Sequence, residues 1–79
     1  MTVTVYGKPG CQPCKQTEKR LVAQGTNFDK VDITQDPAAY ELITGLGYMQ
    51  APVVVVRDAE GNESHWSGFS PDKIKSLSA

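Results

Sequence analysis

Residues 7–14 read Gly-Lys-Pro-Gly-Cys-Gln-Pro-Cys, and this stretch decides the fold because it lies between a predicted strand and a predicted helix. Before it, Val and Thr alternate over residues 2–6, which is typical of a strand. After it, residues 12–24 are rich in strong helix formers, and Gly25 is a natural stop. Pro13 is tolerated because the first turn of a helix has no intrahelical partner for the N–H it lacks. The sequence therefore predicts a strand–Cys-x-x-Cys–helix unit.

The remainder of the chain predicts three more strands and two more helices. Strands are expected at residues 28–33, 53–56 and 63–67, the second a run of four valines typical of a central strand covered on both faces. Asp36-Pro37 and Ser70-Pro71 each place a capping residue before a proline, so we expect a helix to begin at each. The first of these helices should end near Gly45 or Gly47. Residues 58–62 should form a hairpin loop.

The resulting order is β-α-β-α-β-β-α, which belongs to the α/β class. Two strands joined through a helix should be parallel, whereas the last two strands form an antiparallel hairpin. We therefore predict a mixed four-stranded sheet flanked by three helices, the minimal thioredoxin-like arrangement. With 79 residues, the chain is expected to form a single domain over 1–79.

Composition argues against several classes of function. The net charge is −1, 39% of residues are hydrophobic, and the longest basic run is Lys19-Arg20, so we expect neither nucleic-acid nor membrane binding. The longest apolar run, residues 53–56, is far shorter than the roughly 20 residues that span a bilayer. The first residues lack the layout of a signal peptide, so we expect a cytoplasmic protein.

The two cysteines are the strongest chemical signal. A bond between Cys11 and Cys14 closes too small a loop to be an effective structural staple, and a close pair inside the cell is more often catalytic or metal-binding. A helix N-terminus stabilises the thiolate of Cys11, and Lys8 either adds a nearby positive charge or is simply solvated, as a lysine on such a loop more often is. Cys14 lies one turn on, close enough to resolve a mixed disulfide formed on Cys11. We predict that Cys11 and Cys14 are the catalytic redox pair.

Metal binding is the main chemical alternative. A structural zinc site needs about four ligands, and the chain has two cysteines and one histidine, His65. A cluster or zinc ion would therefore need a second copy or an outside ligand. We predict no metal site, no cofactor beyond the disulfide itself, and no catalytic role for His65.

Two further segments are candidates for contacts with a substrate. Ala51-Pro52 precedes the strand at 53–56, where a trans proline is the ordinary interpretation. In this topology that loop returns beside the cysteines, and a cis bond would direct its backbone groups toward the substrate's sulfur. Residues 66–69, Trp-Ser-Gly-Phe, are either core or a partner-docking patch. Tyr48 and Met49 are likewise either core or rim.

Three segments together resemble the NrdH-redoxins: Cys-Gln-Pro-Cys at 11–14, Gln-Ala-Pro-Val-Val at 50–54, and Trp-Ser-Gly-Phe-Ser-Pro-Asp-Lys-Ile at 66–74. That family combines a glutaredoxin-like fold with thioredoxin-like behaviour. The resemblance implies reduction by thioredoxin reductase, electron donation to the large subunit of class Ib ribonucleotide reductase, and a cis Pro52 against the redox pair. The expected substrate-binding residues are Lys8, Gln12, Pro13, Ala51, Pro52, Trp66, Ser67, Gly68 and Phe69.

The resemblance also bears on glutathione. Glutathione-using glutaredoxins usually have a glycine pair and acidic residues after the last strand, where this chain has the bulky, uncharged residues 66–69. Pro13 directly before Cys14 is the thioredoxin pattern.

The chain departs from the family at Gln12-Pro13, where valine-glutamine is frequent, at Ser70, where arginine is common, and at Gly7, where threonine is common. A glutathione-dependent glutaredoxin and a cluster-binding module remain the alternatives, and nothing requires more than a monomer.

Overall fold

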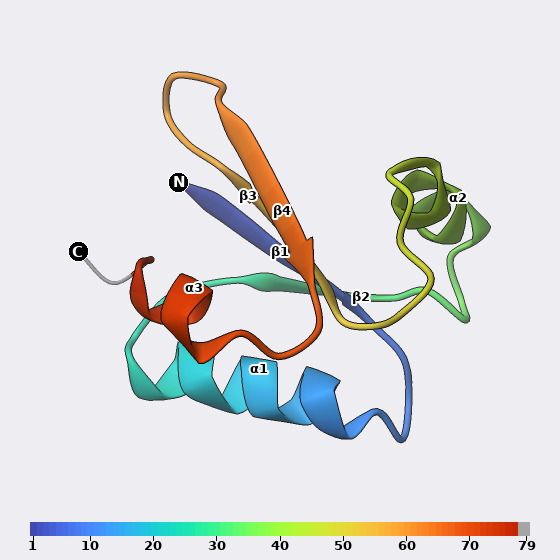
Figure 1. Ribbon diagram of the computed structural model, residues 1–79, viewed down its shortest axis with the longest axis horizontal. Helices are drawn as coiled ribbons and strands as arrows, with labels where there is room; N and C mark the ends of the chain where they lie inside the picture. Colours follow the sequence, from blue (N-terminus) through green and yellow to red (C-terminus); the bar gives the residue numbers. More distant parts are fainter. Residues whose placement is uncertain (78–79) are drawn as a thin grey trace.

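The computed structural model describes residues 1–77, and within them the helices and strands follow the predicted order (Figure 1). The elements are β1 (Thr2–Gly7), α1 (Gln12–Ala23), β2 (Asp29–Asp32), α2 (Pro37–Gly45), β3 (Val53–Arg57), β4 (Glu63–Ser67) and α3 (Pro71–Lys75). The largest difference from the expected boundaries is at β2, which is shorter than the predicted 28–33. No helix in this described part of the chain is long and apolar enough to cross a membrane.

The four strands form one mixed sheet in the order β2-β1-β3-β4. β1 pairs parallel with β2 and antiparallel with β3, and β3 pairs antiparallel with β4. Val54 of β3 lies opposite both Val5 and Trp66, so one row of side chains crosses three strands. Helices α1 and α3 cover one face of the sheet and α2 the other (Figure 1). The predicted mixed sheet, with the valine strand β3 in an inner position, is confirmed.

The main core lies between the sheet and the pair α1 and α3. Because side chains on a strand alternate between faces, every second residue of β1 and β3 contributes to it. Its members are Val3, Val5, Leu21, Val54, Val56, Trp66 and Ile74, with Phe28, Phe69 and Leu77 packed against it. On the opposite face, Val53 is buried together with Ala39 and Ile43 of α2. Strand β3 is therefore covered on both faces of the sheet, as its run of valines predicted.

One of the two predicted proline-associated caps forms as expected. The Asp36 carboxylate accepts the Ala39 N–H at 3.2 Å and caps α2. Ser70 occupies the corresponding position before α3, but its side chain makes no capping hydrogen bond, so that part of the prediction is wrong. The five-residue α3 is held by tertiary contacts instead. Ile74 is fully buried, and the Gln24 side-chain amide donates to its carbonyl at 2.8 Å.

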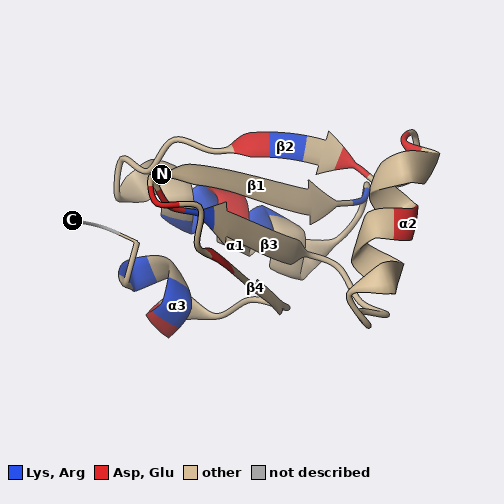
Figure 2. Ribbon diagram, turned by 90° about the horizontal axis from the view of Figure 1, so that it is seen from above, with Lys and Arg blue, Asp and Glu red and all other residues tan. Residues whose placement is uncertain are grey.

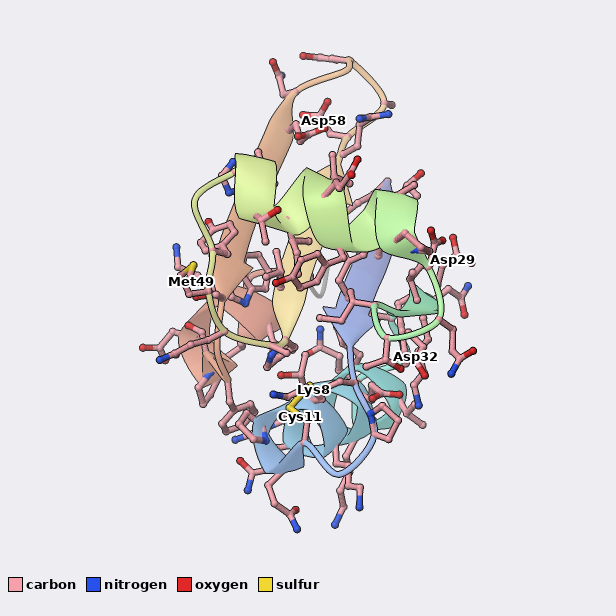
Figure 3. All side chains as sticks on the ribbon, turned by 90° about the vertical axis from the view of Figure 1, so that its right-hand side faces the viewer. Lys8, Cys11, Asp29, Asp32, Met49 and Asp58 are labelled. Carbon is pink, nitrogen blue, oxygen red and sulfur yellow. A yellow bond between two sulfur atoms is a disulfide. The ribbon has the colours of Figure 1, made fainter. Side chains whose placement is uncertain are left out.

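The β3–β4 hairpin is closed by the Asp58 carboxylate. Its Oδ1 accepts the N–H groups of Glu60 and Asn62, each at 2.9 Å. The hydrogen bond from the Asn62 backbone is the largest of the causes that lower the pKa of Asp58. This hairpin lies at the opposite end of the molecule from Cys11 (Figure 3), which makes it a useful location for control substitutions.

The core packing of α1 gives a stability prediction with a control at the next residue. Leu21 is 0% exposed, whereas Val22 is 68% exposed on the same helix. Leu21→Ala should lower the free energy of unfolding by about 2–5 kcal/mol because it leaves a cavity in the core. Val22→Ala should change it by less than about 0.5 kcal/mol. Denaturant unfolding of both variants measures this, and equal losses would contradict the assignment of the buried face.

Candidate redox site

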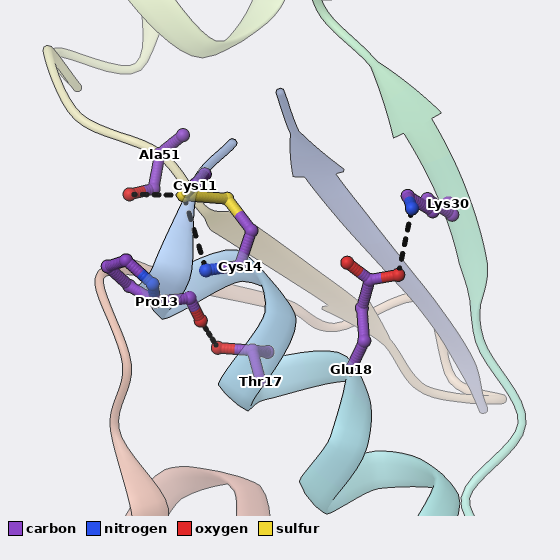
Figure 4. Close-up of a disulfide and its surroundings, with 7 residues drawn as sticks. All are labelled: Cys11, Pro13, Cys14, Thr17, Glu18, Lys30 and Ala51. Carbon is purple, nitrogen blue, oxygen red and sulfur yellow. Dashed lines mark hydrogen bonds and ion pairs between the residues drawn. A yellow bond between two sulfur atoms is a disulfide. The ribbon is translucent and has the colours of Figure 1, made fainter. Parts of the chain in front are cut away.

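The Cys11–Cys14 pair is a disulfide at the start of α1 (Figure 4). Cys11 is the N-cap residue, and its Sγ accepts the Cys14 N–H at 3.2 Å. The Cα atoms are 5.2 Å apart, and Cys11 is 7% exposed against 2% for Cys14. In the dithiol form, the same N–H and the positive end of the helix dipole favour a thiolate on Cys11. The helix N-terminus predicted for this pair is confirmed.

The first turn of α1 is fixed by buried hydrogen bonds. Thr17 is 0% exposed, and its hydroxyl donates to the Pro13 carbonyl at 2.8 Å. The Lys15 N–H donates to the Cys11 carbonyl at 3.1 Å. Strand β1 passes close to the same turn, since a Cβ on Gly7 would lie 3.2 Å from the Cys14 Sγ. Gly7 therefore allows the strand to approach the inner sulfur.

The loop before β3 lies against the outer sulfur. The Ala51–Pro52 peptide bond is cis, as the family resemblance implied. The Ala51 carbonyl oxygen is 3.8 Å from the Cys11 Sγ (Figure 4). The Pro52 carbonyl accepts the Gly68 N–H at 2.8 Å. Three segments distant in sequence thus meet beside one sulfur atom.

Residues 66–69 divide between core and surface. Trp66 is 8% exposed and belongs to the core, with the Lys73 ammonium 5.8 Å from its ring centroid. Its Nε1 is buried and has no hydrogen-bond partner among the described residues. Ser67 ends β4 opposite Val53, and Phe69 is half-buried at the edge of the core. Of the two aromatic residues, Phe69 is therefore the one that reaches the surface.

A groove of about 350 Å³ lies beside Ala51, on the side of the sheet that α2 covers. Its lining includes Lys8, Ile33, Tyr40, Ile43, Tyr48 and Met49. The sequence left Tyr48 and Met49 open between core and rim, and the structure places both at the rim. Met49 is 92% exposed, and the Tyr48 hydroxyl is 2.6 Å from His65 Nδ1. Figure 3 shows Lys8 next to Cys11 at this end of the molecule.

A second hollow, of about 200 Å³, lies on the other side of the couple and is lined by Cys14 and charged residues. Among them, Glu18 and Lys30 form an ion pair at 3.2 Å (Figure 4). The Thr34 hydroxyl and N–H both donate to Asp32, and these bonds lower the pKa of that carboxyl, with Lys30 adding a smaller effect. Because its folded pKa is lowered, the contribution of Asp32 to stability is present at neutral pH and is lost as pH falls through that pKa.

Sequence reasoning named some of the residues that line these two hollows, among them Lys8, Ala51 and Cys14, but missed others, notably Ile33, Tyr40 and Glu18. One signal was available, because the parallel strands β1 and β2 end at the same edge of the sheet and the loops after them must meet there. That argument could have identified Ile33. Within residues 1–77, no three His, Cys, Asp or Glu side chains are grouped so that they could hold a metal ion.

Known proteins resemble the chain over nearly its full length. The glutaredoxin family model matches residues 3–60. The gene 56 protein of Mycobacterium phage L5 is 40% identical over 78 residues, covering 95% of this chain and 70% of that protein. The glutaredoxin-like protein NrdH of Escherichia coli K12 is 32% identical over 77 residues, covering 98% of this chain and 89% of that protein. The solved structure of Escherichia coli NrdH-redoxin, a glutaredoxin-like protein with a thioredoxin-like activity profile, matches with a TM-score of 0.88 over 98% of this chain and 95% of that one. The thioredoxin-like fold is confirmed.

Two glycines allow a test of the contact between Gly68 and Pro52. Gly68 and Gly61 both have positive φ, +81° and +86°, so alanine at either position costs roughly 1–2 kcal/mol of stability. Only Gly68 donates to the loop beside Cys11. Gly68→Ala should therefore also slow the reaction of the reduced protein with a disulfide by about tenfold, since small misplacements of a reacting site are costly.

Stopped-flow oxidation and thermal unfolding measure the two effects separately. Gly61→Ala should lose similar stability and keep the wild-type oxidation rate. If both variants reacted at the wild-type rate, the bond between Gly68 and Pro52 would have no part in the chemistry.

Proposed function

The chain belongs to the glutaredoxin family, among its glutaredoxin-like NrdH proteins, and we propose that it carries electrons from thioredoxin reductase to a class Ib ribonucleotide reductase. It is a thiol–disulfide oxidoreductase, and its Cys11–Cys14 pair forms the disulfide. The support for this particular role is the near-complete match to NrdH-redoxin, whose activity profile is thioredoxin-like. The proposed target is the large subunit of the reductase, and the proposed contribution is to deoxyribonucleotide synthesis.

The proposed cycle begins with the Cys11 thiolate. It attacks one sulfur of the target disulfide, forms a mixed disulfide and releases the other target sulfur as a thiolate. Cys14 then loses its proton to solvent and attacks the Cys11 Sγ, which forms the intramolecular disulfide and releases the second target thiolate. The target gains two electrons and, from water, two protons. Cys11 is the more exposed of the two cysteines and its sulfur accepts the N-cap hydrogen bond, which supports its assignment as the nucleophile.

We propose that the target segment binds around Cys11. The Ala51 carbonyl and the buried Pro52 form one wall, with the segment from Ser67 to Phe69 beside them. The exposed residues Lys8, Gln12 and Pro13 form the outer margin. Trp66 contributes from inside the core by holding the end of β4, which carries Ser67 and leads into Gly68. Residues 66–69 include no acidic side chain that could bind glutathione.

The need to reduce the Cys11–Cys14 disulfide again after each turnover bears on the cellular compartment as well as on the reductase. A dithiol that must return to its reduced form after every turnover needs a reducing environment, which the cytosol supplies. We therefore propose cytoplasmic action, with no cofactor beyond the couple and a monomer as the active unit.

Substitution of each cysteine should separate the two roles. Cys14→Ser should form a stable mixed disulfide through Cys11, because the resolving thiol is absent. Cys11→Ser should lose at least about 10³-fold of the reductase activity, since the nucleophile is absent. Mass spectrometry of the trapped adduct and an insulin reduction assay measure these outcomes. Full activity in Cys11→Ser would reverse the assignment.

The experiment that tests the partner follows NADPH consumption with insulin as the disulfide acceptor and two recycling systems in parallel. We expect turnover with thioredoxin reductase and little turnover with glutathione plus glutathione reductase. The reverse result would identify a glutathione-dependent glutaredoxin. Visible absorption and bound iron in protein purified without oxygen would instead support the cluster-binding alternative.

A further inference from the structure

Charge is distributed unevenly along the chain. Residues 1–20 carry four cationic side chains and one carboxylate, whereas residues 21–79 carry four cations and eight carboxylates. In the structure, many of the cationic side chains lie on different elements from most of the acidic ones. Lys and Arg gather on α1 and α3, whereas Asp and Glu mark β2, α2 and the hairpin (Figure 2). The helix that begins at the redox couple is therefore one of two cationic helices in a weakly acidic protein (Figure 2).

The cations of residues 1–20 also differ from the others in their partners. Lys30 pairs with Glu18, Arg57 pairs with Glu63, and Lys73 lies over the Trp66 ring. Within the described part of the chain, Lys8, Lys15, Lys19 and Arg20 form no ion pair, and all four are exposed. The unpaired positive charge thus lies on the loop and helix that hold the couple.

Helix stability does not explain the two lysines of α1, whereas Arg20 lies in the last turn, where the macrodipole favours a cation. Lys15 and Lys19 are four residues apart, so they lie on the same side of α1 and repel one another. Lys15 is also close to the helix N-terminus, where the macrodipole disfavours a cation, and the first turn holds no acidic residue to compensate. A partner that carries carboxylates would relieve both effects.

The exposed side of α1 extends from the hollow beside Cys14, which Lys15 helps to line together with Glu18, to another hollow at Phe69. We call Lys15, Lys19 and Arg20 the basic stripe. A shallow hollow of about 410 Å³ adjoins it, lined by Gln16, Lys19, Arg20, Ala23 and Phe69. Phe69 and Ala23 supply apolar lining to this hollow, and Lys19 and Arg20 line it as well. A segment lying along the stripe therefore meets positive charge near Cys11 and an apolar contact further on.

We infer that the preferred substrate is a disulfide carried in an acidic segment, with carboxylates on the basic stripe and an apolar side chain over Phe69. Opposite charge raises the rate at which such a segment reaches Cys11, and the attraction weakens as salt screens it. The inference rests on the proposed function, since it names the substrate class of the same site. It does not depend on which reductase recycles the couple.

The experiment uses the full chain, reduced chemically and freed of reductant, so that no reductase is present. Two synthetic peptides share one intramolecular disulfide and one leucine, and they differ in that four flanking residues are glutamate in one and glutamine in the other. Acid quenching followed by thiol alkylation and mass spectrometry gives the second-order rate constant for each peptide. At low ionic strength, we expect the glutamate peptide to react about tenfold faster, within the range of electrostatic steering. The ratio should fall toward one in molar salt.

Substitution of the basic stripe provides the matched test. Lys15→Gln combined with Lys19→Gln should reduce the ratio to about twofold or less while leaving the rate with the glutamine peptide unchanged. Glutamine forms helix nearly as well as lysine, so folding is retained, and circular dichroism checks this. The control combines Arg57→Gln with Lys75→Gln, which removes the same charge away from the couple and should keep most of the preference.

The outcomes divide clearly. Equal rates for the two peptides in the wild type, or a preference that salt does not change, would overturn the inference. So would a preference that survives in the stripe variant or is lost equally in the control. Failure of thioredoxin reductase to recycle the protein would contradict the proposed function and leave these peptide rates unaffected.

Discussion

The hydrogen bond from the Cys14 N–H to the Cys11 Sγ is the interaction on which the arrangement of the site depends. It makes Cys11 at once the cap of α1 and the outer sulfur of the couple. Because a helix must begin at that residue, Cys14 lies one turn inward and is almost fully buried. Gly7 then allows β1 to pass close to the inner sulfur. The requirement for a helix cap and the requirement for a stabilised thiolate are met by one atom.

The sheet brings the remaining parts of the site to this cap. β1 leads into the couple and pairs directly with β3, so the residues just before β3 lie at the same edge of the sheet. Ala51 therefore lies beside Cys11, and β4, which pairs with β3, brings Gly68 within hydrogen-bond distance of Pro52. Each contact follows from strand order and register rather than from proximity in sequence. This explains how a chain of 79 residues can assemble a site from three distant segments.

The sequence was most informative where one residue type has one strong local consequence. Alternation in β1 and the valines of β3 identified the strands, and Asp36-Pro37 identified the start of α2. Ser70-Pro71 carried the same signal, yet the serine side chain makes no cap, and α3 is held by the burial of Ile74 and by the hydrogen bond from Gln24. Tertiary contacts of this kind have no local signature. The cis bond at Pro52 was likewise expected from family resemblance, since an X-Pro pair before a strand is compatible with either isomer. The Glu18–Lys30 ion pair beside Cys14 links a helix to a strand, and no local spacing indicates it.

Helix α1 has a buried face that packs against the sheet and an exposed face that carries positive charge, and the period of the helix keeps the two apart. Cys14, Thr17 and Leu21 recur at intervals of three and four and are buried against the sheet. Lys15, Lys19 and Arg20 occupy the exposed side and contribute nothing to the core. Changes on the exposed side can therefore alter which partner approaches without moving the sulfur atoms or the packing beneath them. The solved Escherichia coli NrdH-redoxin has the same fold, with a TM-score of 0.88, at only 32% sequence identity. In this chain the redox couple lies at the cap of α1, and the recognition surface that we propose lies along the outside of the same helix.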